Sequence, residues 1–247
     1  MSETTEPLTG NTAKLVFALL VVSIFSAAFH LEAPANLWQL PLTIEVLDSP
    51  DTSIDDPVEI PDFAAIQDVE TKKQVFFDFL QPYIDAENEK VRQQRERLAG
   101  LIEKITQGKT LDRIERVFIR ELSTEYELEF DNELDIAFLN RLLRRVDVIP
   151  PSLVLAQAAN ESAWGTSRFA QQANNFFGQW CYSEGCGLVP KRRRASASHE
   201  VKAFNSIEDA VNAYFMNLNT FPSYLDLRLI RAGLRENSQS IDGISPT

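Results

Sequence analysis

The residues best suited to chemistry lie in the segment AQAANESAWGTSRF, residues 156–169. Pro150 and Pro151 precede it, and proline is tolerated in the first turn of a helix. A mostly apolar run predicts a buried helix that ends at Gly165. Glu161 would lie on its last turn, where the helix dipole favours cations and does not stabilise an acid. Burial without a cation favours a protonated carboxyl group, which is what general acid catalysis needs.

Polar and aromatic residues accompany Glu161. Gln157 lies one helical turn earlier on the same face, and Trp164 follows within one turn. The run Asn174-Asn175-Phe176-Phe177-Gly178 comes soon after. A polar pair beside aromatic residues is typical of a carbohydrate-binding cleft. The simpler alternative places Glu161 on the solvent side of an amphipathic helix, because Glu is seldom fully buried.

Together these motifs resemble the glucosaminidase family of bacterial wall hydrolases (glycoside hydrolase family 73), and within it the Bax-like proteins of Gram-negative bacteria. The resemblance covers roughly residues 148–229 and rests on AQAANESAWG, SRFA and NNFFG. It implies a lysozyme-like domain, no cofactor, and the glycan strands of peptidoglycan as substrate. The implied activity is that of an endo-β-N-acetylglucosaminidase, with Glu161 as the general acid.

The second catalytic group stays open at this point. Glycoside hydrolysis also needs a group that stabilises or traps the oxocarbenium-like centre. We favour Glu200, because the family can supply a second carboxylate from its β lobe, and Glu184 in the same lobe is the competitor. Alternatively the substrate's own acetamido group attacks, oriented by Tyr224 or Asn160. The resemblance implies that Tyr224 lines the cleft.

Further side chains are candidates for binding sugar. Aromatic residues stack on sugar rings and amides bind acetamido groups; these candidates are Gln157, Asn160, Trp164, Asn175, Phe177, Trp180 and Tyr182. About half of the aromatic candidates are expected to pack in the core instead, Trp164 first among them. Asn175 and Gln157 have the alternative role of satisfying backbone groups.

Composition excludes several other classes of function. The net charge of −12 argues against a nucleic-acid partner, which needs a basic surface. His30 and His199 are isolated and only two cysteines occur, so we expect no metal site. Cys181 and Cys186 predict a small disulfide-closed loop in an exported protein and two free thiols in a cytosolic one.

The N-terminal region favours export. Residues 1–14 form a polar, cytoplasmic tail, and residues 15–31 are apolar, with a length between a signal-peptide core and a spanning helix. Lys14 precedes them and no Lys or Arg follows until residue 72, which favours a cytoplasmic N-terminus. We expect an inner-membrane signal anchor and a periplasmic catalytic domain. The alternatives are a cleaved signal peptide and a buried core helix.

The remaining chain predicts a mainly α, α+β protein. An acidic, Pro-rich linker (residues 32–62) leads to a helical extension (63–147), where Pro82 interrupts one helix and a long charged helix ends at Gly108. The glucosaminidase domain (148–236) would contain a small β lobe between Phe177 and Phe204 and a helix that opens with a capping box at Ser206. Residues 237–247 form a polar tail.

One charged run is left without a role. Lys191-Arg192-Arg193-Arg194 is the only dense basic stretch in the chain. A solvated loop is the default interpretation. The functional alternative is attraction to an anionic polymer such as peptidoglycan, whose stem peptides carry carboxylates.

Three functions therefore compete. The leading hypothesis is a membrane-tethered endo-β-N-acetylglucosaminidase acting on peptidoglycan. A lytic transglycosylase is the close rival, since the same scaffold can work with one Glu. A non-catalytic wall-binding or scaffolding module is the alternative from a different class. An amidase acting on the stem peptide is disfavoured, because the sequence shows no set of zinc ligands.

Overall fold

A computed structural model describes residues 59–130, 134–194, 197–239 and 241. The predicted cytoplasmic tail, membrane segment and most of the acidic linker lie outside these ranges. No helix within the described part of the chain is long and apolar enough to cross a membrane. The described residues belong to one compact unit, in which the predicted extension and the predicted glucosaminidase domain pack together.

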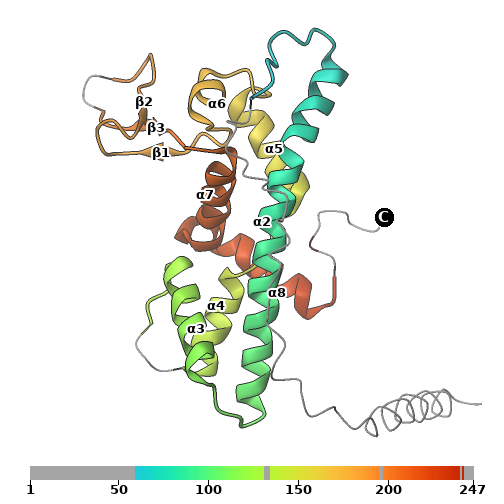
Figure 1. Ribbon diagram of the computed structural model, residues 1–247, viewed down its shortest axis with the longest axis vertical. Helices are drawn as coiled ribbons and strands as arrows, with labels where there is room; N and C mark the ends of the chain where they lie inside the picture. Colours follow the sequence, from blue (N-terminus) through green and yellow to red (C-terminus); the bar gives the residue numbers. More distant parts are fainter. Residues whose placement is uncertain (1–58, 131–133, 195–196, 240, 242–247) are drawn as a thin grey trace, which may run out of the picture. The chain divides into compact units, whose positions relative to one another are not determined.

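Helix α2 (Val69–Thr106) is the element on which the others assemble (Figure 1). It has 38 residues and is about 57 Å long at 1.5 Å per residue. Helices α3 (Arg113–Glu125) and α4 (Ile136–Arg145) lie against one end of it, and α5 (Pro151–Ser162) and α7 (Ile207–Thr220) lie further along. The short helix α6 (Arg168–Ala173) follows α5. The fold is mainly helical, as predicted.

The predicted break at Pro82 is wrong, because α2 continues through it. A proline inside a helix costs about 3 kcal/mol through a lost hydrogen bond and a steric clash. Phe76, Leu80 and Ile84 lie on one face on both sides of Pro82 and are completely buried. Their burial stabilises the continuous helix by about 1.5–3 kcal/mol each, which outweighs that cost.

The β lobe is a small antiparallel sheet. Its strands are β1 (Trp180–Cys181), β2 (Gly187–Leu188) and β3 (Glu200–Lys202), in the spatial order β1-β3-β2. Val201 pairs with Trp180 on one side and with Leu188 on the other. The predicted disulfide between Cys181 and Cys186 is present, with an S–S distance of 1.97 Å. The predicted lobe and its closed loop are thus confirmed.

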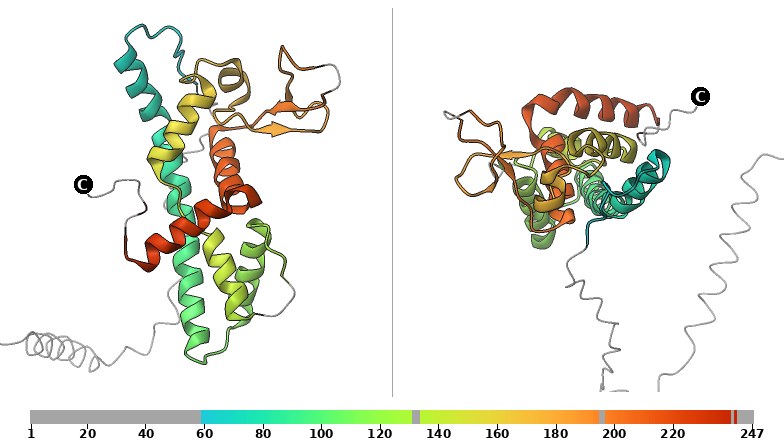
Figure 2. Two further views of the ribbon diagram at one scale, coloured as in Figure 1. Left: turned by 180° about the vertical axis from the view of Figure 1, so that it is seen from behind. Right: turned by 90° about the horizontal axis from the view of Figure 1, so that it is seen from above.

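The C-terminal elements follow the predicted pattern up to residue 236. Ser206 caps α7 by accepting a hydrogen bond from the Asp209 N–H (3.1 Å), and the helix ends before Phe221. The 3₁₀ turn η3 (Pro222–Tyr224) leads into α8 (Leu225–Glu236), which crosses α2 on the side facing the viewer in the left panel of Figure 2. Beyond α8, the side chain of Ile241 is buried against the core, so the C-terminal segment is not purely a polar tail.

A buried charged cluster fixes the segment that precedes α5. The Asp147 carboxylate is 2% exposed and lies 2.5 Å from the Arg235 guanidinium and 3.5 Å from that of Arg95. Arg231 donates to the carbonyl oxygens of Asp147 (3.1 Å) and Val148 (2.9 Å), and burial lowers the pKa of this arginine to about 10. The cluster joins α2 and α8 at the entrance to α5, so both helices set the position of that helix.

Candidate active site

The sequence Glu-Ser-Ala-Trp-Gly (residues 161–165) forms a turn at the end of α5. The residues Ala163, Trp164 and Gly165 all have positive φ, at 52°, 58° and 75°. Ser162 holds this turn: its hydroxyl donates to the Ala158 carbonyl (2.6 Å) and accepts from the Gly165 N–H (2.8 Å). The helix therefore ends three residues before the predicted stop, and Ser162 has a structural role.

Aromatic residues of the N-terminal region hold this turn from the other side. The Phe63 ring lies so close to Gly165 that a Cβ there would be 2.3 Å from Phe63 Cδ2. Trp164 packs edge-to-face on Phe76 (ring centroids 5.6 Å apart) and lies 5.5 Å from Phe77. Trp164 is half-buried and packs against the core, as predicted, and its role in sugar binding stays a prediction. Sequence reasoning did not find these contacts, because they join residues about 90 positions apart.

Glu161 lies on the surface, so the expectation of a buried acid is wrong. The buried side of α5 carries Val154, Ala158 and Ser162 at four-residue intervals. Glu161 and its neighbours Gln157 and Asn160 lie on the exposed side. The alternative interpretation, which places Glu161 on the solvent side of an amphipathic helix, is therefore correct. An exposed carboxyl group is directly accessible to a bound polymer.

The NNFFG loop places a glycine against the Glu161 carboxylate. Asn175 closes this loop: its side chain donates to the carbonyls of Gln179 (2.9 Å) and Lys202 (2.8 Å) and accepts from the Gln179 N–H (3.1 Å). Asn175 is 1% exposed, so it satisfies backbone groups and does not bind substrate. Gly178 has φ +64°, and a Cβ there would lie 2.8 Å from Glu161 Oε2.

Replacing Gly178 with Ala is expected to lower activity at least tenfold. The new methyl group would displace the carboxylate of Glu161, the expected general acid, and a shift of about 1 Å in a reacting group can cost about 100-fold in rate. Because of the positive φ, the alanine is also strained, which lowers the free energy of unfolding by about 1–2 kcal/mol. Gly108→Ala is the matched control, since Gly108 has φ +74° with no atom within 4 Å of its Cβ position. Steady-state rates and urea denaturation of both variants check this; equal rates would contradict the assigned contact.

Tyr214 is a candidate site residue that the sequence did not indicate. Its ring stacks on Phe177 at 4.3 Å between centroids and 16° between planes. Burial, with the nearby Tyr224 hydroxyl and Glu161 carboxylate, raises the pKa of Tyr214 well above its usual value. Its hydroxyl therefore stays protonated and is available as a donor beside Glu161 and Tyr224. Phe177 is 7% exposed and supports Tyr214, so it is not a sugar platform.

The raised pKa predicts a loss of stability at high pH. Below pH 10 Tyr214 is protonated in both the folded and the unfolded chain. Above pH 10 only the unfolded chain releases this proton, so the free energy of unfolding falls by about 1.4 kcal/mol per pH unit through this group. Tyr214→Phe lacks this loss. Urea denaturation at pH 9.5, 10.5 and 11 should show the difference between wild type and variant shrinking as pH rises; a constant difference would refute it.

The β lobe presents the two remaining aromatic candidates to solvent. Trp180 is 56% exposed and stacks on His199, with ring centroids 4.4 Å apart, and Tyr182 is 70% exposed. Tyr224 is half-buried at the start of α8. Of the predicted sugar-binding residues, the exposed ones are Gln157, Asn160, Trp180 and Tyr182.

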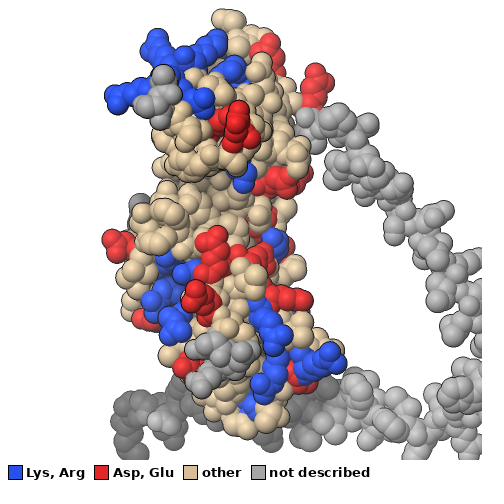
Figure 3. Space-filling view, turned by 90° about the vertical axis from the view of Figure 1, so that its left-hand side faces the viewer, with Lys and Arg blue, Asp and Glu red and all other residues tan. Residues whose placement is uncertain are grey.

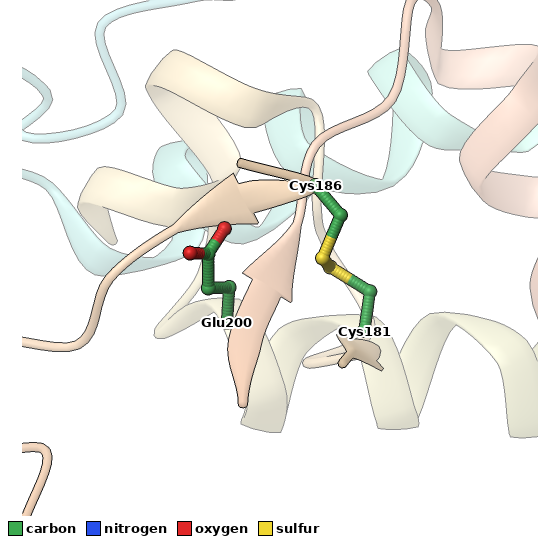
Figure 4. Close-up of side chains that lie close together, drawn as sticks. All are labelled: Cys181, Cys186 and Glu200. Carbon is green, nitrogen blue, oxygen red and sulfur yellow. A yellow bond between two sulfur atoms is a disulfide. The ribbon is translucent and has the colours of Figure 1, made fainter. Parts of the chain in front are cut away.

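Glu200 holds the disulfide-closed turn. Its carboxylate is 5% exposed and accepts hydrogen bonds from the N–H groups of Gly185 (3.2 Å) and Gly187 (2.9 Å). Figure 4 shows it beside the Cys181–Cys186 disulfide. These three side chains have the ligand types of a metal site, but both sulfurs are bonded to each other and only a thiolate binds metal. Glu184, the competing carboxylate, is exposed in the same turn.

Comparison with known proteins identifies the family. Residues 137–241 match the glucosaminidase model, described as mannosyl-glycoprotein endo-beta-N-acetylglucosaminidase. Protein bax of Escherichia coli (strain K12) is 33% identical over 182 residues, which cover 74% of this chain and 63% of that protein. The chain thus spans less than two thirds of the length of this relative. No solved structure matches the chain. With the Glu161 turn and the NNFFG loop inside the matched region, the chain is a Bax-like protein of the glucosaminidase family.

Proposed function

We propose that this protein is a glycosidase that cleaves the glycan strands of peptidoglycan, with Glu161 as the general acid. The observation that carries the proposal is the position of Glu161: within a glucosaminidase-family domain, its carboxylate is exposed against Gly178 and close to Tyr214. Glycosidic bond cleavage needs a proton donor at the leaving oxygen. The Glu161 carboxyl group can give a proton to the leaving oxygen and take one back from water, whereas burial keeps the Tyr214 hydroxyl protonated.

An exposed acid becomes a proton donor when the substrate covers it. A sugar that lies over Glu161 replaces water around the carboxyl group, which favours the protonated form. Glu161 then gives its proton to the glycosidic oxygen as the bond to the anomeric carbon breaks. We propose that Tyr224 and the protonated Tyr214 hydroxyl orient the group that meets the developing positive charge.

We further propose endo-β-N-acetylglucosaminidase activity with assistance from the substrate. In this route the acetamido oxygen attacks the anomeric carbon, and water then opens the resulting ring and returns a proton to Glu161. The contacts of Glu200 support this route, since both of its oxygens already accept backbone N–H groups. Glu200 is then a positioning residue, and a second carboxylate as base is the alternative.

Glu200→Gln separates the two routes. An amide cannot accept both N–H groups in the same way, so we expect a loss of about 1–3 kcal/mol in the free energy of unfolding. The rate should stay within tenfold of wild type at a temperature where both proteins are folded, and its pH profile should not change. A fall in rate as large as that of a Glu161 variant would instead make Glu200 the second catalytic carboxylate.

We propose that residues 15–31 anchor the chain in the inner membrane, with the catalytic domain in the periplasm. The Cys181–Cys186 disulfide supports this placement, because such bonds persist in oxidising compartments. Protein taken from cells into an alkylating reagent should be unmodified at both cysteines until it is reduced. Full modification without reductant would contradict the periplasmic placement.

The proposed activity is tested first by incubating the purified chain with isolated sacculi. A glycosidase lowers the turbidity of the suspension and releases soluble muropeptides. A wall-binding module pellets with the sacculi and releases nothing, and that result would replace the proposed function with the structural alternative.

A further inference from the structure

The end of the β lobe carries a concentration of positive charge on an acidic protein. Lys191, Arg192, Arg193 and Arg194 are consecutive, and we call them the basic tip. Figure 3, which looks at the β-lobe side of the molecule, shows Lys and Arg side chains gathered at the top. Residues 180–202 contain five Lys and Arg against two Glu, whereas the whole chain has a net charge of −12.

These charges form no ion pair with an acid in the part of the chain that the structure describes. The ion pairs formed by described residues involve α2, its contacts with α3, and the Asp147 cluster, and none of them includes a residue of the basic tip. Lys191, Arg192 and Arg194 are exposed. Of the two acids of the lobe, Glu200 is buried and bound to backbone N–H groups, and Glu184 forms no ion pair with a described residue. The tip is therefore free to bind an external anion.

The tip is also held in place on the lobe. The Arg168 guanidinium donates to the Val189 carbonyl (2.9 Å), which fixes the approach to the tip from α6. The Arg193 guanidinium donates to the carbonyl of His199, the residue that precedes β3 (3.1 Å). The backbone N–H of Arg193 donates to the Pro190 carbonyl (3.0 Å). A preordered loop loses less conformational entropy when it binds a ligand.

The lobe connects the tip with the catalytic acid. Strand β1 begins two residues after Gly178, which contacts Glu161, and it presents Trp180 to solvent. The Trp180 ring stacks on His199, which lies beside the return of the tip. A polymer bound at Glu161 can thus extend along the lobe toward the tip.

We propose that the basic tip binds the carboxylates of peptidoglycan stem peptides on the strand whose glycan is cleaved at Glu161. This inference rests on the proposed function and names the part of the substrate that gives specificity. Guanidinium groups bind carboxylates through paired, charge-assisted hydrogen bonds, and three of the four tip residues are arginines. The tip distinguishes cross-linked wall, which carries peptides, from a bare N-acetylated glycan.

The test compares two variants on two substrates. The tip variant carries Lys191→Gln, Arg192→Gln and Arg194→Gln. Its matched control carries Lys109→Gln, Arg113→Gln and Arg141→Gln, which remove the same charge from exposed positions near or on α3 and α4. One substrate is intact sacculi, and the other is glycan strands from which an amidase has removed the stem peptides.

On intact sacculi the tip variant should show about a tenfold higher KM with an unchanged kcat, because three exposed charge contacts are lost. On peptide-free strands the tip variant and wild type should have equal KM values. The control variant should match wild type on both substrates. Raising the salt concentration from 50 to 500 mM should weaken wild-type binding to sacculi far more than binding of the tip variant.

Several results would overturn the proposal. One is an equal KM for the tip variant and wild type on intact sacculi. Another is an equal rise in the KM of the tip variant on both substrates, and a third is the same rise in the KM of the control variant. Binding to vesicles of anionic phospholipid that the tip variant loses, with an unchanged KM on sacculi, would assign the tip to a lipid surface instead. If wild type cleaves no glycan, the proposed function fails, and cosedimentation with sacculi still decides the role of the tip.

Discussion

Replacing Glu161 with Gln is expected to lower the rate of glycan cleavage by about 10²–10⁴-fold, which is the usual contribution of a general acid. Glutamine has nearly the same shape and hydrogen-bonding reach, but it has no proton to give to the leaving oxygen. The side chain is exposed, so the free energy of unfolding should change by no more than about 0.5 kcal/mol. The release of reducing ends from sacculi measures the rate, and urea denaturation confirms that the variant is folded.

The control for this variant is Glu184→Gln. Glu184 is also an exposed acid, and it lies in the disulfide-closed turn. Its replacement removes the same charge and should leave the rate within about threefold of wild type. A Glu161 variant that keeps the parental rate would show that Glu161 is not the acid, and a Glu184 variant that loses the rate would make Glu184 the second catalytic carboxylate.

Phe76→Ala is expected to cause the largest loss of stability, about 3–5 kcal/mol. The Phe76 ring is completely buried in α2 and contacts the rings of Phe63, Trp164 and Phe176. Truncation leaves a cavity directly under the Trp164–Gly165 turn that ends the Glu161 helix. We therefore expect kcat to fall as well, by at least tenfold, because the turn loses the ring that fixes it.

Phe138→Ala is the matched control for this prediction. Phe138 is 2% exposed, but it lies in α4 and outside the contacts of the Glu161 turn. Its truncation should cost a similar free energy of unfolding and leave kcat unchanged at a temperature where both variants are folded. If both variants keep the wild-type kcat, α2 only stabilises the fold and does not position the turn that follows Glu161.

The importance of α2 for the site could not be read from the family motif. The matched region begins at residue 137, whereas Phe63, Phe76 and Phe77 come from the region before it. Helical periodicity in α2 predicts that these residues are buried, but it does not say which distant residues they contact. Pro82 predicts a break in this helix. The helix is continuous, because the residues on both sides of Pro82 are buried on one face.

Local patterns predicted what local contacts determine. The cap at Ser206, the helix end before Phe221 and the Cys181–Cys186 loop each depend on residues a few positions apart, and each is confirmed. The burial of Glu161 was wrong for the opposite reason. Small apolar neighbours made the whole helix look buried, while the register of Val154, Ala158 and Ser162 turns Glu161 outward.

Roles for polar candidates were also set by contacts across the fold. Asn175 was a candidate for binding acetamido groups, yet its amide bridges the NNFFG loop and β3. Glu200 was the favoured second carboxylate, yet both of its oxygens accept backbone hydrogen bonds. The sequence does not indicate a site role for Tyr214, because a Tyr on the apolar side of a helix is typical of a core residue. Only the fold shows that it stacks on Phe177 beside Glu161 and Tyr224.

Identification of the sugar ends in a digest tests the central claim most directly. Purified wild-type protein and the Glu161→Gln variant are incubated with sacculi, and the products are reduced with borohydride and examined by mass spectrometry. We predict new reduced N-acetylglucosamine ends from wild type and none from the variant. Anhydro-muramic ends would make the protein a lytic transglycosylase, and the same N-acetylglucosamine ends from the variant at the wild-type rate would contradict the role of Glu161.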